Sequence, residues 1–334
     1  MELIDLTLIW VGIVSFAIFM YVIMDGFDLG VGILFPFAPG DQARDDMMNS
    51  VAPVWDGNET WLILGGAGLL AAFPLMYAVM LPALYIGVFL MLAGLIFRGV
   101  AFEFRFKARG NRHLWDYSFN LGSTVAAFAQ GAVVGAYIQG FNTENMQYVG
   151  GAFDWLTPFT VMTGLGVVVG YALLGVTWTI IKTEGEVQDW AYRLAPKLLG
   201  ALMLFFLIVS IWTPLAHERV MARWIDNISV LWIFPALTLV VAVTALRALM
   251  QRKEVVPFLC TLLIFALFLL GMAISKWPYA VPPTYTFHEA ASDPGSQLFL
   301  LLGFLFVIPI VLGYTAWTYW VFRGKVSGKH GYGH

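Results

Sequence analysis

The sequence is poor in charge and in cysteine. Only 12% of its 334 residues are charged, against about 25% in a typical soluble domain. Its one cysteine, Cys260, excludes an internal disulfide and a cysteine-rich metal site. The net charge of −3 comes without a basic or acidic tail, so nothing indicates a nucleic-acid partner. The shortage of charge argues against a soluble protein.

Histidine is scarce where a cofactor would need it. Haem inside a helix bundle needs His or Met ligands at membrane depth. The five histidines lie at helix ends, in a loop or in the last residues: His113, His217, His288, His330 and His334. The sequence also has no P-loop, no GxSxG and no HExxH motif. We therefore expect no haem bound by this chain's own ligands, no metal site and no catalytic residue.

Hydrophobic residues fill most of the chain instead. They make up 60% of it, with 27 Phe and 13 Trp. About 20 apolar residues cross a bilayer as a helix. Nine segments meet this requirement: 7–37, 52–74, 78–102, 117–141, 157–181, 197–216, 228–250, 257–275 and 297–322. The sequence predicts an all-α, polytopic membrane protein, and the second segment is the weakest because it begins with polar WDGNETW.

The distribution of Lys and Arg predicts the orientation. Nine spans place the two termini on opposite sides. Fourteen of the 18 Lys and Arg residues then fall on the side of the C-terminus, three fall on the other side, and Arg98 lies inside a helix. Positive residues favour the cytoplasmic side, so we expect the N-terminus outside and the C-terminus in the cytoplasm.

The loop after the fourth helix divides the chain into two halves of different character. No segment outside the expected spans is long enough for a soluble domain. Residues 1–150 form a front bundle, helices one to four, that carries the buried charges. Residues 151–334 form a back bundle with almost uncharged helices, followed by the last helix and a short cytoplasmic tail. The expected fold is therefore two four-helix bundles plus one extra helix.

Four ionisable residues are predicted to share one depth near the cytoplasmic side. Asp25 and Asp28 lie in the cytoplasmic half of the first helix, three apart and on one face. Asp56 begins the second helix, and Arg98 lies near the end of the third. One cation cannot neutralise three aspartates, so at least one carboxyl is expected to hold a proton and to act in a proton relay.

Structural explanations of the same residues stay open. A buried Asp–Arg pair can simply lock helices together. Asp56 also suits a helix N-cap, and Glu59 is more typical of an acid in a first helical turn than of a relay. Trp55 and Asn58 lie where a polar cavity could begin. Small residues at Gly26 and Gly30 form a G-x-x-x-G step at which another helix can approach closely.

Several motifs, in order, resemble one known family. They are DGFDLGVG, NSVAPVWDGNETWL, LIFRGVAFEFR, PYAVPP and GYTAWTYWVFRGKV, and the resemblance around them extends from about residue 9 to about residue 326. The chain resembles subunit II of the cytochrome bd family of quinol oxidases. His288 and Glu289 stand where the commoner form has Trp-Asp, and with the GKHGYGH tail they resemble the cyanide-insensitive branch.

The resemblance implies a role in aerobic respiration in the bacterial inner membrane. The family's enzymes oxidise quinol at the outer face, here periplasmic, and reduce O2 to water, which contributes to the proton motive force. Subunit I binds the haems, two b-type and a haem d or a third b-type haem. Subunit II is haem-free, forms a heterodimer with it, supports haem assembly and helps to deliver cytoplasmic protons. Some members hold a structural ubiquinone or a small single-helix accessory subunit.

The resemblance places the acidic residue of the proton route at Asp56. With the residues identified above, the expected proton pathway is Asp56, Asp25 and Asp28, with Arg98 as the buried ion-pair partner and Trp55, Asn58 and Glu59 as supporting neighbours. Two alternatives stay open. A proton-coupled secondary transporter also has intramembrane carboxylates, and a purely structural assembly subunit needs no proton route.

Overall fold

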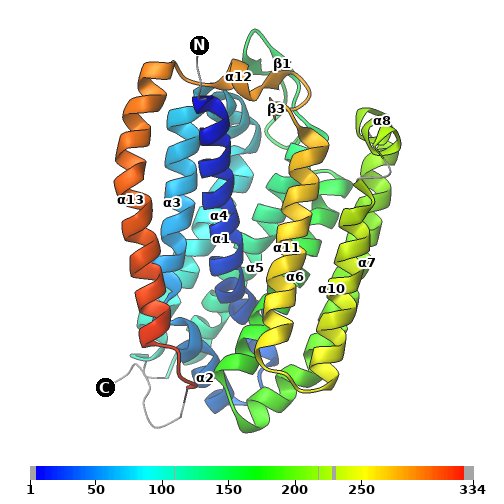
Figure 1. The fold of residues 1–334 in the computed structure, drawn as a ribbon. Coiled ribbons are helices and arrows are strands. Elements are labelled where there is room, and N and C mark those ends of the chain that lie inside the picture. The colour runs from blue at the N-terminus through cyan, green and yellow to red at the C-terminus, as the bar shows by residue number, and fades with distance from the viewer. Residues whose placement is uncertain (1–4, 109, 217, 228–230, 327–334) are drawn as a thin grey trace.

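The computed structural model describes residues 5–108, 110–216, 218–227 and 231–326. Long helices stand side by side, and short elements cover the two ends (Figure 1). We call these the α2 end and the α12 end, after the short helices that lie there. The helices are α1 (Leu6–Leu34), the 3₁₀ turn η1 (Phe35–Phe37), α2 (Asp41–Val51), α3 (Trp55–Ala72), α4 (Pro74–Arg105), α5 (Arg112–Gln139), α6 (Pro158–Lys182), α7 (Gly185–Ala216), α8 (Glu218–Asp226), α10 (Ile233–Met250), α11 (Val255–Lys276), α12 (Phe287–Ala290) and α13 (Pro294–Val321).

Eight of the described helices are long and apolar enough to cross a membrane: α1, α4, α5, α6, α7, α10, α11 and α13. When α3 is counted with these eight, successive long helices run in alternating directions, so α1 begins at the α12 end and α13 finishes at the α2 end (Figure 1). The second expected span corresponds to α3, which is not among the eight because its first two turns are polar. The all-α, polytopic fold is confirmed, whereas the count of nine spans stays a prediction.

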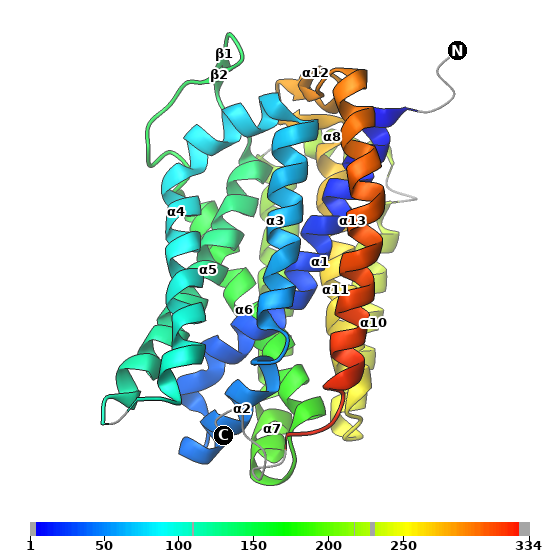
Figure 2. The ribbon, with the colours of Figure 1, turned by 90° about the vertical axis from the view of Figure 1, so that its left-hand side faces the viewer.

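Helices α1, α5 and α6 form the centre of the molecule. Helix α6 packs against α1, α5 and α7, and α1 also packs against α3. The last helix, α13, lies at the periphery beside α3 and α1 (Figure 2). Because α6 of the expected back bundle is in direct contact with α1 of the front bundle, the two halves share one core. Their division into separate bundles near residue 150 stays a prediction.

Glycines bring α1 and α6 into direct backbone contact. A Cβ atom on Gly30 would lie 1.8 Å from the carbonyl oxygen of Tyr171, and one on Gly175 would lie 2.3 Å from the carbonyl carbon of Gly30. Gly26 faces the ring of Tyr171 in the same way. The close approach predicted from the G-x-x-x-G step is therefore confirmed, and α6 is the helix that approaches.

Local sequence signals set several helix ends. The Asp5 side chain accepts a hydrogen bond from the backbone of Leu8 and caps α1. Pro74 occupies the first turn of α4 and ends the preceding helix at Ala72, as expected for a residue that lacks an N–H donor. A capping box at Thr157 begins α6.

Two hairpins and α12 cover the α12 end. Strand β1 (Thr143–Glu144) pairs with β2 (Gln147–Tyr148), and β3 (Tyr279–Val281) pairs with β4 (Tyr285–Thr286). Trp10 donates its indole N–H to the carbonyl of Gln297 at 3.1 Å. His288 Nε2 lies 2.9 Å from Asp5 Oδ2. These contacts fix the beginning of α1 against α12 and the first turn of α13.

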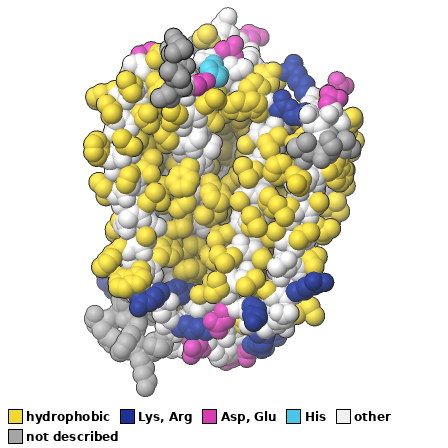
Figure 3. Space-filling model, in the orientation of Figure 1, with side chains coloured by type: hydrophobic (Ala, Val, Ile, Leu, Met, Phe, Trp, Pro, Cys, Tyr) yellow, Lys and Arg dark blue, Asp and Glu magenta, His cyan; other side chains and the backbone are white. Residues whose placement is uncertain are grey.

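The surface agrees with a membrane environment. Hydrophobic side chains cover the middle of the face in Figure 3, and Lys and Arg gather mainly along its lower edge, the α2 end. A polar band at each end and an apolar waist between them are typical of a membrane-spanning protein.

A short segment after α13 is held against the α2 end. Lys182 Nζ, at the end of α6, donates hydrogen bonds to the carbonyls of Phe322 and Gly324. Lys325 Nζ lies 2.7 Å from Glu254 Oε1, which also accepts from Gln188 Nε2 at 2.9 Å. The last helix is therefore tied to α6, α7 and α11. Residues 327–334, with the tail motif, lie outside the described residues.

Substitution Glu254→Gln is expected to lower thermal stability in a pH-dependent way. The hydrogen bond from Lys325 lowers the pKa of Glu254. A carboxyl with a lowered pKa stabilises the folded protein above its unfolded pKa, about 4.3 for glutamate, and loses this contribution as the pH falls through the lowered value. The melting temperature of detergent-solubilised Glu254→Gln should thus lie below that of the wild type at neutral pH, and the two melting temperatures should converge in acid.

The matched control for this prediction is Glu103→Gln. Glu103 is an exposed carboxylate whose one ion pair among the described residues is with nearby Lys107, so its loss should detach no other helix. If the melting temperatures of Glu254→Gln and the wild type differed as much in acid as at neutral pH, the role given to the Glu254–Lys325 ion pair would be contradicted.

Candidate functional site

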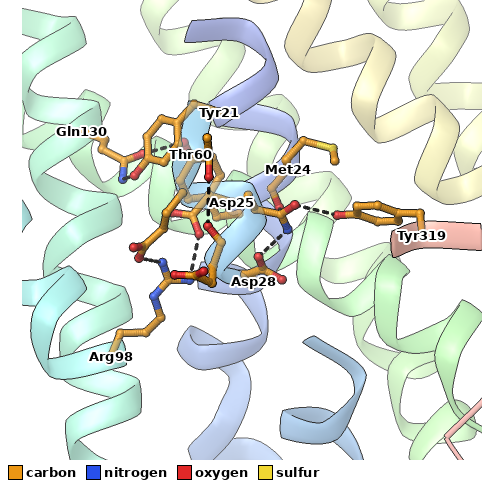
Figure 4. A network of polar contacts seen from close by, with 12 residues as sticks. Tyr21, Met24, Asp25, Asp28, Thr60, Arg98, Gln130 and Tyr319 are labelled. Carbon is orange, nitrogen blue, oxygen red and sulfur yellow. Dashed lines mark hydrogen bonds and ion pairs between the residues drawn. The ribbon is translucent and has the colours of Figure 1, made fainter. Parts of the chain in front are cut away.

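An ion triad lies inside the bundle between α1, α3 and α4. Arg98 Nη1 donates to Asp25 Oδ1 at 2.8 Å, and Arg98 Nη2 donates to Glu59. The side chains of Arg98 and Asp25 are 0% and 1% exposed, whereas that of Glu59 is 27% exposed. Figure 4 shows Arg98 extending from α4 towards Asp25 on α1. The buried guanidinium of Arg98 therefore joins three helices.

Asp28 has a different set of partners from Asp25. Its Oδ2 accepts a hydrogen bond of 2.7 Å from Asn58 Nδ2, which also donates to the carbonyl of Met24. The hydroxyl of Tyr319 donates to Asn58 Oδ1 at 3.0 Å. A second branch of the cluster thus runs from α13 through α3 to α1 (Figure 4).

A third branch continues into α5 and α6. Tyr171 donates its hydroxyl to Gln130 Oε1 at 2.7 Å, and Gln130 Nε2 donates to the hydroxyl of Tyr21 at 2.8 Å. Tyr21 lies one helical turn from Asp25 on α1. Polar groups of α1, α3, α4, α5, α6 and α13 therefore meet around one pair of buried aspartates, and we call them the polar cluster: Tyr21, Asp25, Asp28, Asn58, Glu59, Arg98, Gln130, Tyr171 and Tyr319.

Asp56 lies outside the polar cluster, at the surface of the chain. It is in the first turn of α3, where Val54 is the N-cap residue, so the N-cap alternative is wrong. Asp56 is exposed, Glu59 is partly exposed one turn further, and Arg98 and Asp25 are buried. Acidic groups on one side of α3 therefore lead from the surface to the polar cluster.

Close helix packing and aromatic rings hold Arg98 in place. A Cβ atom on Gly122 of α5 would lie 2.8 Å from the backbone nitrogen of Arg98, so α5 touches α4 at this residue. The Trp55 ring lies 5.6 Å from the guanidinium and stacks on Phe102. The guanidinium thus sits over an aromatic face, which favours the charged group.

The expected supporting neighbours all lie beside the buried charges. Trp55 contacts Arg98, and Asn58 contacts Asp28. Glu59 lies in the second turn of α3 and pairs with Arg98, so the interpretation as a first-turn acid is wrong. Whether any of these residues conducts protons stays a prediction.

Sequence reasoning missed four members of the polar cluster, on α1, α5, α6 and α13: Tyr21, Gln130, Tyr171 and Tyr319. Gln130 is a lone amide in the apolar stretch AAFAQGAVV, a signal that could have been used. Tyrosines carry no such signal, because their rings suit a membrane helix whether or not the hydroxyl has a partner.

The charge balance of the polar cluster is uneven. Three carboxyl groups face one guanidinium, and Oδ2 of Asp25 and Oδ1 of Asp28 have no hydrogen-bond partner among the described residues. A buried carboxylate without a partner is costly, so a proton or a water molecule is needed at these oxygens. Such an arrangement can take up, hold and release a proton.

A second network ties α2, α4 and α5 together at the α2 end. Arg105, whose side chain is 0% exposed, pairs with Asp45 at 2.6 Å and with Asp116. Arg112 also pairs with Asp45. Sequence analysis counted Arg105 and Arg112 only as residues that set the orientation. Here they fix the loop between α4 and α5.

The described residues contain no group of three or more His, Cys, Asp or Glu side chains placed to hold a metal ion. They do form an apolar groove between α5, α6, α7 and α11. Gly166 and Thr163 belong to its wall, and Thr163 supplies its polar side chain. Four phenylalanines line much of the rest: Phe205, Phe206, Phe265 and Phe268. A hydrocarbon chain fits such a lining.

Comparison with known proteins identifies the fold and the family. The family model described as "Cytochrome bd terminal oxidase subunit II" matches residues 6–322. The chain is 29% identical to cytochrome bd-I ubiquinol oxidase subunit 2 of Escherichia coli K12, over 96% of this chain and 95% of that one. It is 28% identical to cytochrome bd ubiquinol oxidase subunit 2 of Bacillus subtilis, over 96% and 97%. A chain of the bd oxidase structure from Geobacillus thermodenitrificans has the same fold, with a TM-score of 0.80 at 18% identity, covering 96% of this chain and 99% of that chain.

Proposed function

The chain belongs to the cytochrome bd terminal oxidase subunit II family, and from this premise we propose that it delivers protons to the O2-reducing site of a quinol oxidase. A member of this family is one component of a quinol oxidase complex, whose partner is subunit I. The chain also supports the assembly of the haems in that partner. It is not catalytic alone.

The observation that carries the proposal is the gradient of exposure along α3. Asp56 is exposed, Glu59 is partly buried, and the Arg98–Asp25 pair is fully buried. Intramembrane carboxyl groups are costly, and in membrane proteins they mark proton and ion pathways. A series of acids from the surface to the interior has the form of a relay that starts at Asp56.

The orientation of the relay follows from the basic residues. We place the α2 end in the cytoplasm and the α12 end outside, in the bacterial inner membrane, because Lys and Arg gather at the α2 end (Figure 3). Asp56 then takes protons from the cytoplasm. Quinol oxidation releases protons outside, so consumption of cytoplasmic protons in O2 reduction separates charge across the membrane and contributes to the proton motive force.

The acids and Arg98 each have a defined task in this proposal. The exposed carboxylate of Asp56 accepts a proton from water, and Glu59, one turn further along α3, receives it. Arg98 compensates the negative charge of the neighbouring acids and keeps the route in place between α3 and α4. The aspartates of α1 lie at its inner end.

The finer composition of the complex is part of the same proposal. Subunit I holds two b-type haems and a haem d or a third b-type haem, and supplies the redox chemistry. The apolar groove between α5, α6, α7 and α11 suits the isoprenoid tail of a structural ubiquinone, and Thr163 is the polar side chain in the lining of this groove. A small single-helix subunit completes the complex in some arrangements, and the His288–Glu289 pair is consistent with the cyanide-insensitive branch.

Substitution Asp56→Asn should slow quinol-driven O2 reduction by at least about tenfold, a change of ~1.4 kcal/mol in the activation free energy. The amide keeps the shape of the side chain and cannot accept the proton. Oxygen consumption of the purified complex measures turnover, and its visible spectrum measures haem content, which should stay unchanged.

The matched control is Asp41→Asn. Asp41 is another exposed acid at the α2 end and pairs with Arg44 in the first turn of α2, so its turnover should equal that of the wild type. Normal turnover of Asp56→Asn would refute the relay, and loss of haem in the same variant would favour the competing hypothesis of a purely structural assembly subunit.

A further inference from the structure

We infer that the two aspartates of α1 have different roles: Asp28 carries an exchangeable proton and is positioned by Tyr319 through Asn58, while Asp25 is the permanent counter-ion of Arg98. This inference rests on the proposed proton-delivering function. It gives separate roles to two aspartates for which the sequence predicts the same role.

Asp25 has the contacts of a fixed anion. Its Oδ1 accepts a charge-assisted hydrogen bond of 2.8 Å from Arg98 Nη1, and both side chains are almost completely buried. Removing either partner leaves an uncompensated charge in a dry interior, which is strongly unfavourable. Asp25 therefore stays ionised for as long as Arg98 remains beside it.

Asp28 lacks such a partner. It is 0% exposed, and no Lys, Arg or His of the described chain forms an ion pair with it. The titratable and charged groups around it are Asp25 on α1, Glu59 on α3, Arg98 on α4 and Tyr319 on α13. Arg98 directs both terminal nitrogens to the other two acids. A buried carboxyl with only an amide donor is stable when it holds a proton.

Asn58 and Tyr319 set the position of Asp28. The amide nitrogen of Asn58 is committed twice, to the carbonyl of Met24 at 3.2 Å and to Asp28 Oδ2 at 2.7 Å. The amide oxygen accepts from the hydroxyl of Tyr319. Turning the amide over would place its oxygen against a carbonyl and a carboxyl oxygen, so this network holds one orientation.

The side chain of Tyr319 is itself held firmly. Its ring packs edge-on against Phe27 and Trp178, with ring centroids 6.4 Å and 6.1 Å apart. The hydroxyl therefore reaches Asn58 from a fixed direction. Tyr319 is a positioning residue, because it acts on Asp28 only through the amide between them.

The proton step at Asp28 involves no electron transfer. The carboxyl releases its proton towards the O2-reducing partner and becomes a carboxylate, which accepts the hydrogen bond from Asn58. One proton from the α2 end then restores the O–H bond. Its second oxygen, Oδ1, has no partner among the described residues and is the atom at which this proton can bind and leave.

The test compares four variants in the purified oxidase complex: Asp28→Asn, Asp25→Asn, Tyr319→Phe and the control Tyr314→Phe. Haem content reports assembly, O2 consumption reports turnover, and the infrared difference spectrum between oxidised and reduced enzyme reports protonated carboxyl groups. Tyr314 lies on the same helix, is 55% exposed and makes no hydrogen bond through its hydroxyl among the described residues.

Asp28→Asn should retain haem, lose about tenfold in turnover, which is ~1.4 kcal/mol, and lose one carboxyl band. Tyr319→Phe should retain haem and that band, shift the band's frequency, and move the pH profile of turnover. Tyr314→Phe should match the wild type. Asp25→Asn should reduce the yield of haem-bearing complex, and the double variant Asp25→Asn/Arg98→Gln should restore part of that yield, because the fully buried ion pair is then removed as a whole and only the partly exposed Glu59 loses its partner.

Loss of the carboxyl band in Asp25→Asn, or in a folded Asp25→Asn/Arg98→Gln complex, would overturn the inference. Wild-type turnover and an unchanged band in Asp28→Asn would overturn it as well. If Asp56→Asn is slow while Asp28→Asn is fast, this inference fails and the proposed function stands. If both variants are fast, the proposed function fails too.

Discussion

Substitution Arg98→Gln is expected to prevent accumulation of the haem-bearing complex. Arg98 is the only cation that contacts the buried acids among the described residues, and it joins α1, α3 and α4 through Asp25 and Glu59. Removing one partner of a buried ion pair costs about 3–5 kcal/mol, a large part of the ~5–15 kcal/mol that stabilises a typical protein. The yield of haem-containing complex in membranes measures the effect.

An exposed arginine provides the matched control for this prediction. Arg252 pairs with Asp189, and both side chains are about half exposed. Exposed ion pairs contribute only about 0–1 kcal/mol, so Arg252→Gln should assemble normally. Normal assembly of Arg98→Gln would mean that the buried acids are neutral without it, and the structural role of the triad would be wrong.

Substitution Gly30→Ala should separate α1 from α6 and block folding. A Cβ atom at Gly30 would lie 1.8 Å from the carbonyl oxygen of Tyr171 and 2.7 Å from the backbone nitrogen of Gly175. Both obstacles are backbone atoms, so no side-chain rotation relieves the clash. Overpacking usually costs about 1–3 kcal/mol, and this site belongs at or above the upper limit. Yield and thermal stability of the complex measure it.

Gly12→Ala is the control on the same helix. Nothing lies within 4 Å of a Cβ atom placed there, and alanine favours a helix over glycine by up to ~1 kcal/mol. Gly12→Ala should therefore be as stable as the wild type or slightly more stable. Equal stability of Gly12→Ala and Gly30→Ala would show that α1 and α6 do not need their backbone contact.

Eight of the nine expected spans could be predicted because each depends on a local property. Apolar runs of about 20 residues identify helices whatever packs around them, and Pro74 marks the break between α3 and α4. Helix α3 was the difficult case, because its polar start lowers its hydropathy while its location beside α1 and α13 depends on tertiary contacts. The packing of α6 against α1 likewise depends on tertiary contacts, which a local sequence pattern does not contain.

The grouping of Asp25, Asp28 and Arg98 could be predicted, but the individual partners of the two aspartates could not. The predicted direction of each of the first three helices across the membrane places four residues in one layer: Asp25, Asp28, Asp56 and Arg98. Residues three apart on a helix differ by about 60° around its axis, so the two aspartates reach different neighbours. Asp25 meets Arg98 and Asp28 meets Asn58. Which helix lies on each side is invisible to a periodic pattern.

Contacts between distant helices also explain why the role of Tyr319, unlike the position of Asp56, could not be read from the sequence. The sequence placed Asp56 near the cytoplasmic surface, in one layer with the buried acids, and in the structure Asp56 is exposed and lies one turn before Glu59. Tyr319 is 261 residues from the amide it contacts. Such a contact follows only from the packing of the last helix beside α3.

The central claim is that protons for O2 reduction reach the partner through this chain. The most direct test is proton uptake from the cytoplasmic side by the complex in proteoliposomes, followed with a pH-sensitive dye as fully reduced enzyme reacts with O2. The account predicts that Asp56→Asn and Asp28→Asn, with full haem content, take up protons about tenfold more slowly than the wild type, a difference of ~1.4 kcal/mol. Uptake at the wild-type rate in both variants would contradict it.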